Sequence, residues 1–246
     1  MSVLLPVLCF GAALVYAMAG FGGGSAYLAF FSLFALPVHD VPPLALTCNL
    51  IVVTTGTYHF VRAKQMPWRT LLTFIATSVP LAYVGGLLRT DEWTLRLVTG
   101  IALILAAVAM LVPTQRAEGD ERAKSAWSPP ILGALLGLLS GFIGIGGGIF
   151  LSPILHLLRW ETPKRIAALA SAFIFVNSIS GLVGQLQKGA AGVFQPHYWW
   201  ILAGVFLGGQ IGTRLGVYRL PPLWVKRVTA VIVLTAGAQL AWRAIA

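Results

Sequence analysis

Two glycine-rich segments interrupt apolar surroundings in this sequence and are the positions where backbone chemistry is most exposed. The first reads AGFGGGSAYL at residues 19–28, and the second reads GIGGGIFLS at residues 144–152. Each glycine lowers the stability of a helix interior by roughly 1 kcal/mol relative to alanine. Three successive glycines therefore predict that one helix ends and another begins at each segment.

A helix that begins directly after such a break has N–H groups without intrahelical partners and a partial positive charge at its start. These groups bind anions, and glycine lets a ligand approach the backbone closely. Close helix packing is the alternative use of glycine, and we prefer it for Gly133, Gly137 and Gly141. At the two triplets we expect an anion site, with the candidate residues Gly22, Gly23, Gly24, Ser25, Gly146, Gly147 and Gly148.

Hydroxyl and amide side chains within the apolar runs are further candidate donors for an anion. Thr47 and Asn49 follow the first triplet, and Ser171 and Asn177 follow the second. Hydrogen bonding to the preceding helical turn is the alternative for Ser and Thr. Because an amide in hydrocarbon needs partners, we expect Asn49 and Asn177 to face the protein interior.

The composition predicts an integral membrane protein of the all-α class. Hydrophobic residues make up 58% of the chain and charged residues 10%, whereas a soluble domain carries about 25% charged residues. The mean hydropathy is +0.85. The net charge of +10 comes from basic residues in short connections, which indicates membrane topology and lipid headgroup contact rather than nucleic-acid binding.

The sequence contains none of the residue patterns that predict an enzyme, a metal site or a cofactor site. All 7 acidic residues fall in or beside loops, so a carboxylate proton relay is not expected. Hydrolase and zinc-protease motifs do not occur, and the glycine runs lack the Lys-Ser/Thr of a phosphate-binding loop. We therefore expect no cofactor, and a small anion and membrane lipid as the partners. The oligomeric state stays open.

The apolar regions that must position these groups fall into two similar halves. They cover residues 3–36, 44–61, 70–88, 94–112, 131–158, 166–187, 197–213 and 223–243. Most are close to the roughly 20 residues that a spanning helix needs, and the two longer ones contain the triplets. We predict a first repeat at 1–112, a cytoplasmic linker at 113–130 and a second repeat at 131–246. Each repeat is a glycine-broken re-entrant helix pair followed by three transmembrane helices.

The basic residues favour an inverted relation between the two repeats. If every apolar region crossed once, the 17 Lys and Arg residues would divide almost evenly between the two sides. If each broken region instead enters and returns on one side, 13 of the 17 Lys and Arg residues become cytoplasmic. Only Arg89, Arg96, Lys188 and Arg243 then lie on the far side. The second arrangement obeys the positive-inside rule.

Taken together, the sequence resembles the TauE/SafE sulfite exporter family over nearly its whole length. The resemblance is carried by GFGGGSAYL and GIGGGIFLSP, by LALTCN and LASAFIFVNS, and by the paired glycines Gly85–Gly86 and Gly208–Gly209. It implies transport of sulfite, sulfoacetate or a related organosulfonate across a bacterial inner membrane, often outward. We expect a secondary transporter that works by alternating access. The alternatives are an anion channel of the same architecture and a non-transporting membrane accessory protein.

Overall fold

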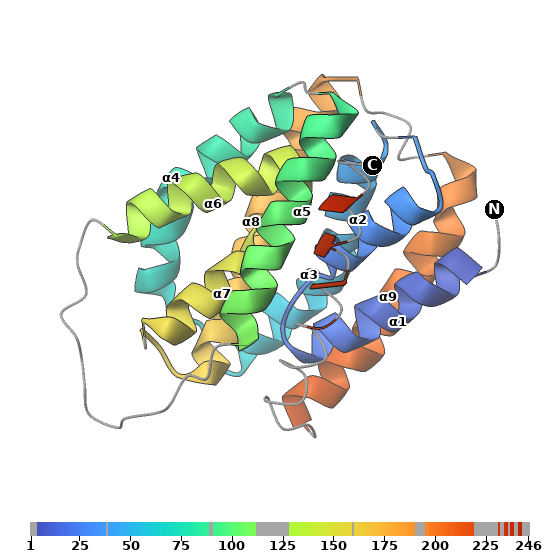
Figure 1. The fold of residues 1–246 in the computed structure, drawn as a ribbon. Helices are drawn as coiled ribbons and strands as arrows, with labels where there is room; N and C mark the ends of the chain where they lie inside the picture. Colours follow the sequence, from blue (N-terminus) through green and yellow to red (C-terminus); the bar gives the residue numbers. More distant parts are fainter. Residues whose placement is uncertain are drawn as a thin grey trace.

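The computed structural model describes residues 4–37, 39–88, 91–111, 128–158, 160–189 and 195–218, together with residues 231, 234, 235, 237, 238, 241 and 242. The predicted all-helical class is confirmed for these residues (Figure 1). The elements are α1 (Leu4–Met18), α2 (Gly24–Leu33), α3 (Val41–Arg62), α4 (Trp68–Leu87), α5 (Glu92–Leu111), α6 (Ser128–Ile143), α7 (Gly148–Leu157), α8 (Pro163–Gln187), the short 3-10 helix η2 (Pro196–Tyr198) and α9 (Trp199–Tyr218).

Most of the predicted linker at 113–130 and most of the last apolar region lie outside the described residues. Residues 128–130, which the sequence assigned to the linker, form the first turn of α6 instead. Pro129 and Pro130 stand in this turn. Proline is tolerated there because the first N–H groups of a helix have no intrahelical acceptor. The linker is thus shorter at this end than expected.

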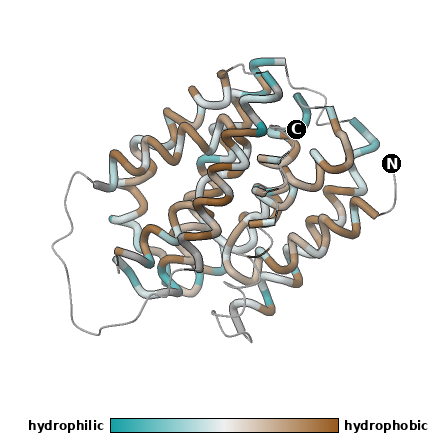
Figure 2. Tube along the Cα trace, in the orientation of Figure 1, coloured by the Kyte–Doolittle hydropathy of each residue, from teal (hydrophilic) through white to brown (hydrophobic). Residues whose placement is uncertain are grey.

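Several described helices have the length and surface of membrane spans. Val41–Arg62, Trp68–Leu87 and Lys164–Gln187 are long and apolar enough to cross a bilayer, while Leu4–Met18, Gly24–Leu33 and Pro129–Ile143 are shorter apolar helices. Apolar colour runs along most of the helices in Figure 2, and polar colour gathers near their ends. Large apolar side chains are exposed on the outer faces of the helices, among them Leu72, Val84, Leu135, Leu207 and Ile211. Such a surface suits lipid.

Both glycine triplets break a helix, as the sequence predicts. The first break separates α1 from α2, and the second separates α6 from α7. Gly23 and Gly147 precede α2 and α7 with φ values of 93° and 76°. This left-handed backbone strains residues that have a Cβ, so glycine is needed at both positions. In Figure 1 the chain turns back at the first break, and α2 packs against α1 and α3.

Helices from the two halves pack reciprocally. At the centre, α3 packs against α8; α4 packs against α6 and α8, and α9 packs against α1 and α3. A Cβ at Gly133, Gly137 or Gly141 of α6 would collide with backbone carbonyls of α4. The predicted packing role of these three glycines is therefore confirmed. Glycine therefore allows α4 to lie directly on α6, the broken helix of the second half, and α9 to lie directly on α1, the broken helix of the first half.

Candidate functional site at the two helix breaks

The two breaks lie against one another in the protein interior. A Cβ at Gly24, the first residue of α2, would lie 2.8 Å from the carbonyl oxygen of Ile145 in the second break. Because α7 begins three residues after Ile145, its start lies within about 11 Å of that residue. Both segments are buried along their length. The fold therefore brings the two glycine triplets together, although they are far apart in the chain.

Asn49 of α3 joins the two breaks. Its amide nitrogen donates to the Ile145 carbonyl at 2.9 Å, and the same nitrogen would lie 2.6 Å from a Cβ at Gly24 and 3.1 Å from one at Gly146. Its amide oxygen faces Gly22 and has no hydrogen-bond partner. The side chain is fully buried, so the expectation that Asn49 faces the interior is confirmed. Any side chain at Gly22 would displace this amide.

The backbone N–H groups at both breaks have no acceptor within the described part of the chain. This holds for residues 22–26 at the start of α2 and for residues 145–149 at the start of α7. Neither helix has a side-chain cap. Buried N–H groups are rarely left without a partner in native proteins. Two helix starts with free donors and partial positive charge thus meet in a region whose residues carry no formal charge.

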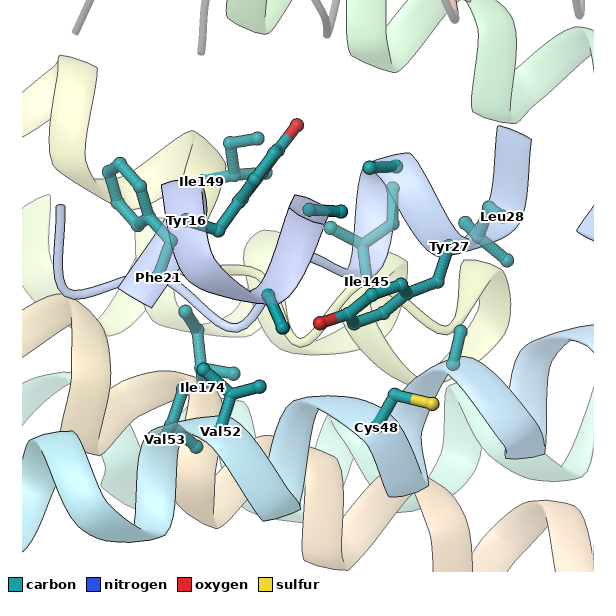
Figure 3. Close-up of a cluster of buried hydrophobic side chains, with 14 of the residues drawn as sticks. Tyr16, Phe21, Tyr27, Leu28, Cys48, Val52, Val53, Ile145, Ile149 and Ile174 are labelled. Carbon is teal, nitrogen blue, oxygen red and sulfur yellow. The ribbon is translucent and has the colours of Figure 1, made fainter. Parts of the chain in front are cut away.

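Aromatic side chains of the first half enclose the start of α2. The Tyr16 hydroxyl lies 2.8 Å from the Ser25 hydroxyl, so Ser25 is held on α1. The Tyr27 hydroxyl lies beside Gly23 and is buried without a partner. Figure 3 shows one apolar cluster containing residues of both halves, among them Tyr16, Phe21, Tyr27, Ile145, Ile149 and Ile174. This cluster excludes water from the junction of the breaks.

The structure does not bring Thr47 and Ser171 to this junction. The Thr47 hydroxyl donates to the Pro43 carbonyl at 2.9 Å, which is the bond to the preceding turn that the sequence left open. Ser171 lies 3.0 Å from the Thr57 hydroxyl, and Thr57 is about 12 Å along α3 from Asn49. Both hydroxyl groups therefore have partners away from the glycine triplets.

Asn177 is fully buried, as expected, but its amide nitrogen donates to the Phe173 carbonyl at 2.8 Å. The remaining predicted residues, Gly147 and Gly148, pack on α8. A Cβ at Gly147 would lie 2.9 Å from the Phe173 ring, and one at Gly148 would lie 2.5 Å from Ile174. These two glycines start α7 close against α8, whereas Gly22, Gly24 and Gly146 surround the Asn49 amide.

A carboxylate that the sequence places in a loop is buried in the structure. Asp40 precedes α3 without capping it, and it accepts a hydrogen bond of 3.0 Å from Tyr198 in η2. Its other oxygen lies 3.6 Å from the exposed His39 ring. Burial and the Asp40 carboxylate raise the pKa of Tyr198 to about 12. This pair fixes the start of α9 to the start of α3.

Sequence reasoning missed several polar groups near the breaks. The hydroxyls of Tyr27, Ser78 and Ser140 are all buried without partners. Ser178, which the sequence offers as a polar residue in an apolar run, is also buried without a partner, whereas Ser140 and Ser78 stand in glycine- and alanine-rich stretches typical of helix packing. For Ser140, the position at the end of an apolar run just before a triplet is the signal that the sequence offers.

The fold and these breaks define a helical membrane protein with a polar centre built from interrupted helices. The chain belongs to the TauE/SafE sulfite exporter family, since the family model described as "Sulfite exporter TauE/SafE" matches residues 5–240. The expected family and its membrane setting are thereby confirmed. The family is one of transporters, so the chain is a membrane transporter and not an enzyme.

Curated relatives support the same class. The probable membrane transporter protein y4hK of Sinorhizobium fredii is 32% identical over 253 residues, covering 98% of each chain. The probable membrane transporter protein YunE of Bacillus subtilis is 24% identical, with 99% of this chain and 98% of the relative covered. The sulfite exporter TauE/SafE family protein 6 of Arabidopsis thaliana is 39% identical over 71 residues, or 26% of this chain and 16% of the relative. No solved structure matches the chain significantly.

Proposed function

We propose that this protein is a secondary transporter that exports a small sulfur-containing anion, such as sulfite, sulfoacetate or a related organosulfonate. The observation that carries the proposal is the meeting of two helix starts whose buried N–H groups have no acceptor. A small oxyanion supplies several acceptor oxygens in one place. Binding by backbone donors and helix dipoles needs no buried cation, and none of the break residues is basic.

In this proposal the anion lies against the N–H groups that follow the two triplets. Asn49 holds the breaks together through Ile145, and the Tyr27 hydroxyl, which lies beside Gly23, is the nearest side-chain donor without a partner. Thr47, Ser171 and the amide nitrogen of Asn177 already have acceptors, so they contribute through helix packing rather than through the anion. The proposed anion site therefore consists of the two glycine segments and the side chains around Asn49.

The two halves are proposed to be inverted repeats that rock against one another. Reciprocal packing supports this relation, because α4 lies on α6 just as α9 lies on α1. The positive-inside rule supports opposite orientations. The protein then resides in the bacterial inner membrane, with the linker on the cytoplasmic side and the central site exposed to each side in turn.

Accessibility of single cysteines tests the inverted arrangement. The native Cys9 and Cys48 are buried, so they give a low background in intact membranes. Gln115→Cys and Glu161→Cys should both react with an impermeant maleimide from the cytoplasmic side, and Lys188→Cys from the opposite side. Labelling of positions 115 and 161 on opposite sides would exclude the re-entrant path.

Transport is tested with purified protein in liposomes. Uptake of radiolabelled sulfite should saturate and should accelerate when unlabelled sulfite is present on the far side. Gly23→Val and Gly147→Val should abolish uptake, because both positions have left-handed backbone and a side chain would collide with Tyr27 at Gly23 and with Phe173 at Gly147. Gly11→Val is the matched control, since nothing lies within 4 Å of a Cβ at Gly11.

Each alternative function gives a different result in the same liposomes. Single-channel currents without acceleration from the far side would identify a channel. Absence of flux for a panel of sulfur oxyanions and carboxylates would identify an accessory protein. Normal sulfite flux in both valine variants would remove the anion site from the glycine triplets.

A further inference from the structure

Beside the second break, four fully buried side chains have oxygens without a hydrogen-bond partner. They come from three helices: Ser78 from α4, Ser140 from α6, and Asn177 and Ser178 from α8. None of these oxygens belongs to the N–H cluster described above. A buried polar atom without a partner destabilises the folded state. Four such atoms in one region therefore indicate that something absent from the protein chain fills it.

Two of these side chains border the second break directly. The Ser178 hydroxyl would lie 2.9 Å from a Cβ at Gly146, and the Cβ of Ser140 would lie 3.3 Å from one at Gly147. Since Gly146 and Gly147 are consecutive, the two serines flank the same short segment from α8 and α6. They stand on the side of the break where α4, α6 and α8 pack together.

The other two side chains lie one helical turn beyond a contact between α4 and α8. The rings of Phe74 and Phe173 have centroids 6.4 Å apart. Further along, the Ser180 hydroxyl donates to the Val79 carbonyl at 2.6 Å, so the two helices advance in the same direction. Residues four positions on share a helix face, so Ser78 and Asn177 stand one turn further along the faces of α4 and α8 that carry the phenylalanine pair.

The backbone of Ser78 also contacts α6. Its Cα would lie 2.5 Å from a Cβ at Gly137, and Ser140 stands one turn after Gly137 on the same helix. Ser78 is therefore about one turn of α6 from Ser140, which borders the second triplet. We refer to the buried region around the four side chains as the polar layer.

The serines in this layer do not make the bond that hydroxyls usually make within helices. Thr47 and Thr54 donate to carbonyls four residues earlier, as is common for such residues. Ser78, Ser140 and Ser178 make no such bond. Because the amide nitrogen of Asn177 donates to Phe173, its free atom is an oxygen that can only accept or coordinate.

The chemistry of this layer suits a small monovalent cation. All four free atoms are neutral oxygens, and the carbonyls of Gly144 and Gly146 accept no hydrogen bond within the described residues. Divalent cation sites usually include carboxylates, and the described residues contain no cluster of acidic, histidine or cysteine side chains. Carbonyl and hydroxyl oxygens at interrupted helices are the usual ligands of Na⁺ in transporters.

We propose that Ser78, Ser140, Asn177 and Ser178 form a carboxylate-free Na⁺ site beside the second helix break. The inference deepens the proposed function, on which it rests for its role: a cation next to the anion site offsets the negative charge of the substrate inside the bilayer. Binding of Na⁺ itself is a property of these oxygens and does not depend on which anion is carried.

Thermal unfolding of the purified protein tests the site without transport. Melting curves are recorded in sodium gluconate and in choline gluconate at equal ionic strength, with no sulfur anion present. Na⁺ should raise Tm in a saturable manner. Ser140→Ala and Ser178→Ala should each increase the Na⁺ concentration for half of this effect by about tenfold or more, since each removes one ligand oxygen. Thr54→Ala, which removes an exposed hydroxyl on α3, should retain the wild-type value.

The outcomes separate this site from the proposed function. A Tm that is the same in sodium and choline would show that water alone fills the layer and would overturn the inference, even if sulfite uptake is normal. Unchanged half-saturation in both serine variants would also overturn it. Saturable stabilisation by Na⁺ that both variants weaken would support the site, and it would do so even if liposomes containing the wild-type protein carried no sulfite.

Discussion

Gly22→Ala isolates the contact that holds the two breaks together. Gly22 does not have a left-handed φ, so alanine is compatible with its backbone. The new Cβ would nevertheless collide with the Asn49 amide oxygen and would lie 2.8 Å from its Cγ and 3.1 Å from its Cβ. Since Gly22 is in buried backbone, the amide must move. It then loses its bond of 2.9 Å to the Ile145 carbonyl.

The expected loss follows from this single bond. A buried carbonyl left without its donor costs about 1–3 kcal/mol, which corresponds to a fall in Tm of about 2–12 °C for a chain of this size. Gly11→Ala is the matched control. It lies within α1 with nothing within 4 Å of the new Cβ, and alanine there should leave Tm unchanged or raise it slightly. Thermal unfolding in detergent measures both variants.

A double-mutant cycle decides whether the Asn49 amide is the cause. Asn49→Ala removes the same hydrogen bond together with the amide oxygen and Cγ, and it leaves only the Cβ at 3.1 Å from the new Cβ. The double variant should therefore be about as stable as Asn49→Ala alone, and the two single losses should not add. Additive losses, or a Gly22→Ala protein with the wild-type Tm, would refute the assigned role of Asn49.

Two further predictions concern buried hydroxyl pairs outside this contact. Ser25→Ala leaves the Tyr16 hydroxyl buried without its partner at 2.8 Å and should lower stability by about 1–3 kcal/mol, whereas adding Tyr16→Phe should recover part of that loss in the same melting assay. Burial and Asp40 raise the pKa of Tyr198 from 10.0 to about 12, so the native state holds this proton more tightly. Its contribution is complete below pH 10 and disappears as the pH rises towards 12, and Tm should fall less steeply over this range in Tyr198→Phe than in the wild type.

Local backbone chemistry made the helix breaks predictable from the sequence. Three consecutive glycines weaken a helix wherever they stand, so the ends of α1 and α6 could be placed to within a few residues. The interior position of Asn49 was predictable for a similar reason, because an amide in an apolar run has to find a partner within the protein. Both inferences needed only neighbouring residues.

Partners that are distant in the chain could not be predicted in the same way. Asn49 donates to Ile145 in the other half, and Tyr198 donates to Asp40, which is 158 residues earlier in the chain. Thr47 stands only two residues from Asn49, yet residues two apart do not share a helix face, and Thr47 bonds to its own helix. Which hydroxyls stay unpaired depends on rotamers and on neighbouring helices. The sequence therefore showed single members of the polar layer, such as Asn177, but not that Ser78 and Ser140 belong with them.

The two breaks are related in packing but differ in chemistry, and this difference bears on the proposed alternating-access cycle. Asn49 and Phe173 occupy the same place relative to their respective triplets, yet Asn49 bridges to the opposite half with a hydrogen bond to Ile145, whereas Phe173 contacts it through the ring of Phe74. In the proposed alternating-access cycle, rocking of one half against the other would break the Asn49–Ile145 bond. A neutral hydrogen bond contributes only about 0.5–1.5 kcal/mol net, which thermal motion can overcome in every cycle. A buried ion pair there would cost about 3–5 kcal/mol to separate and would hold the protein in one state. A neutral amide at the junction therefore suits a protein that alternates between two arrangements.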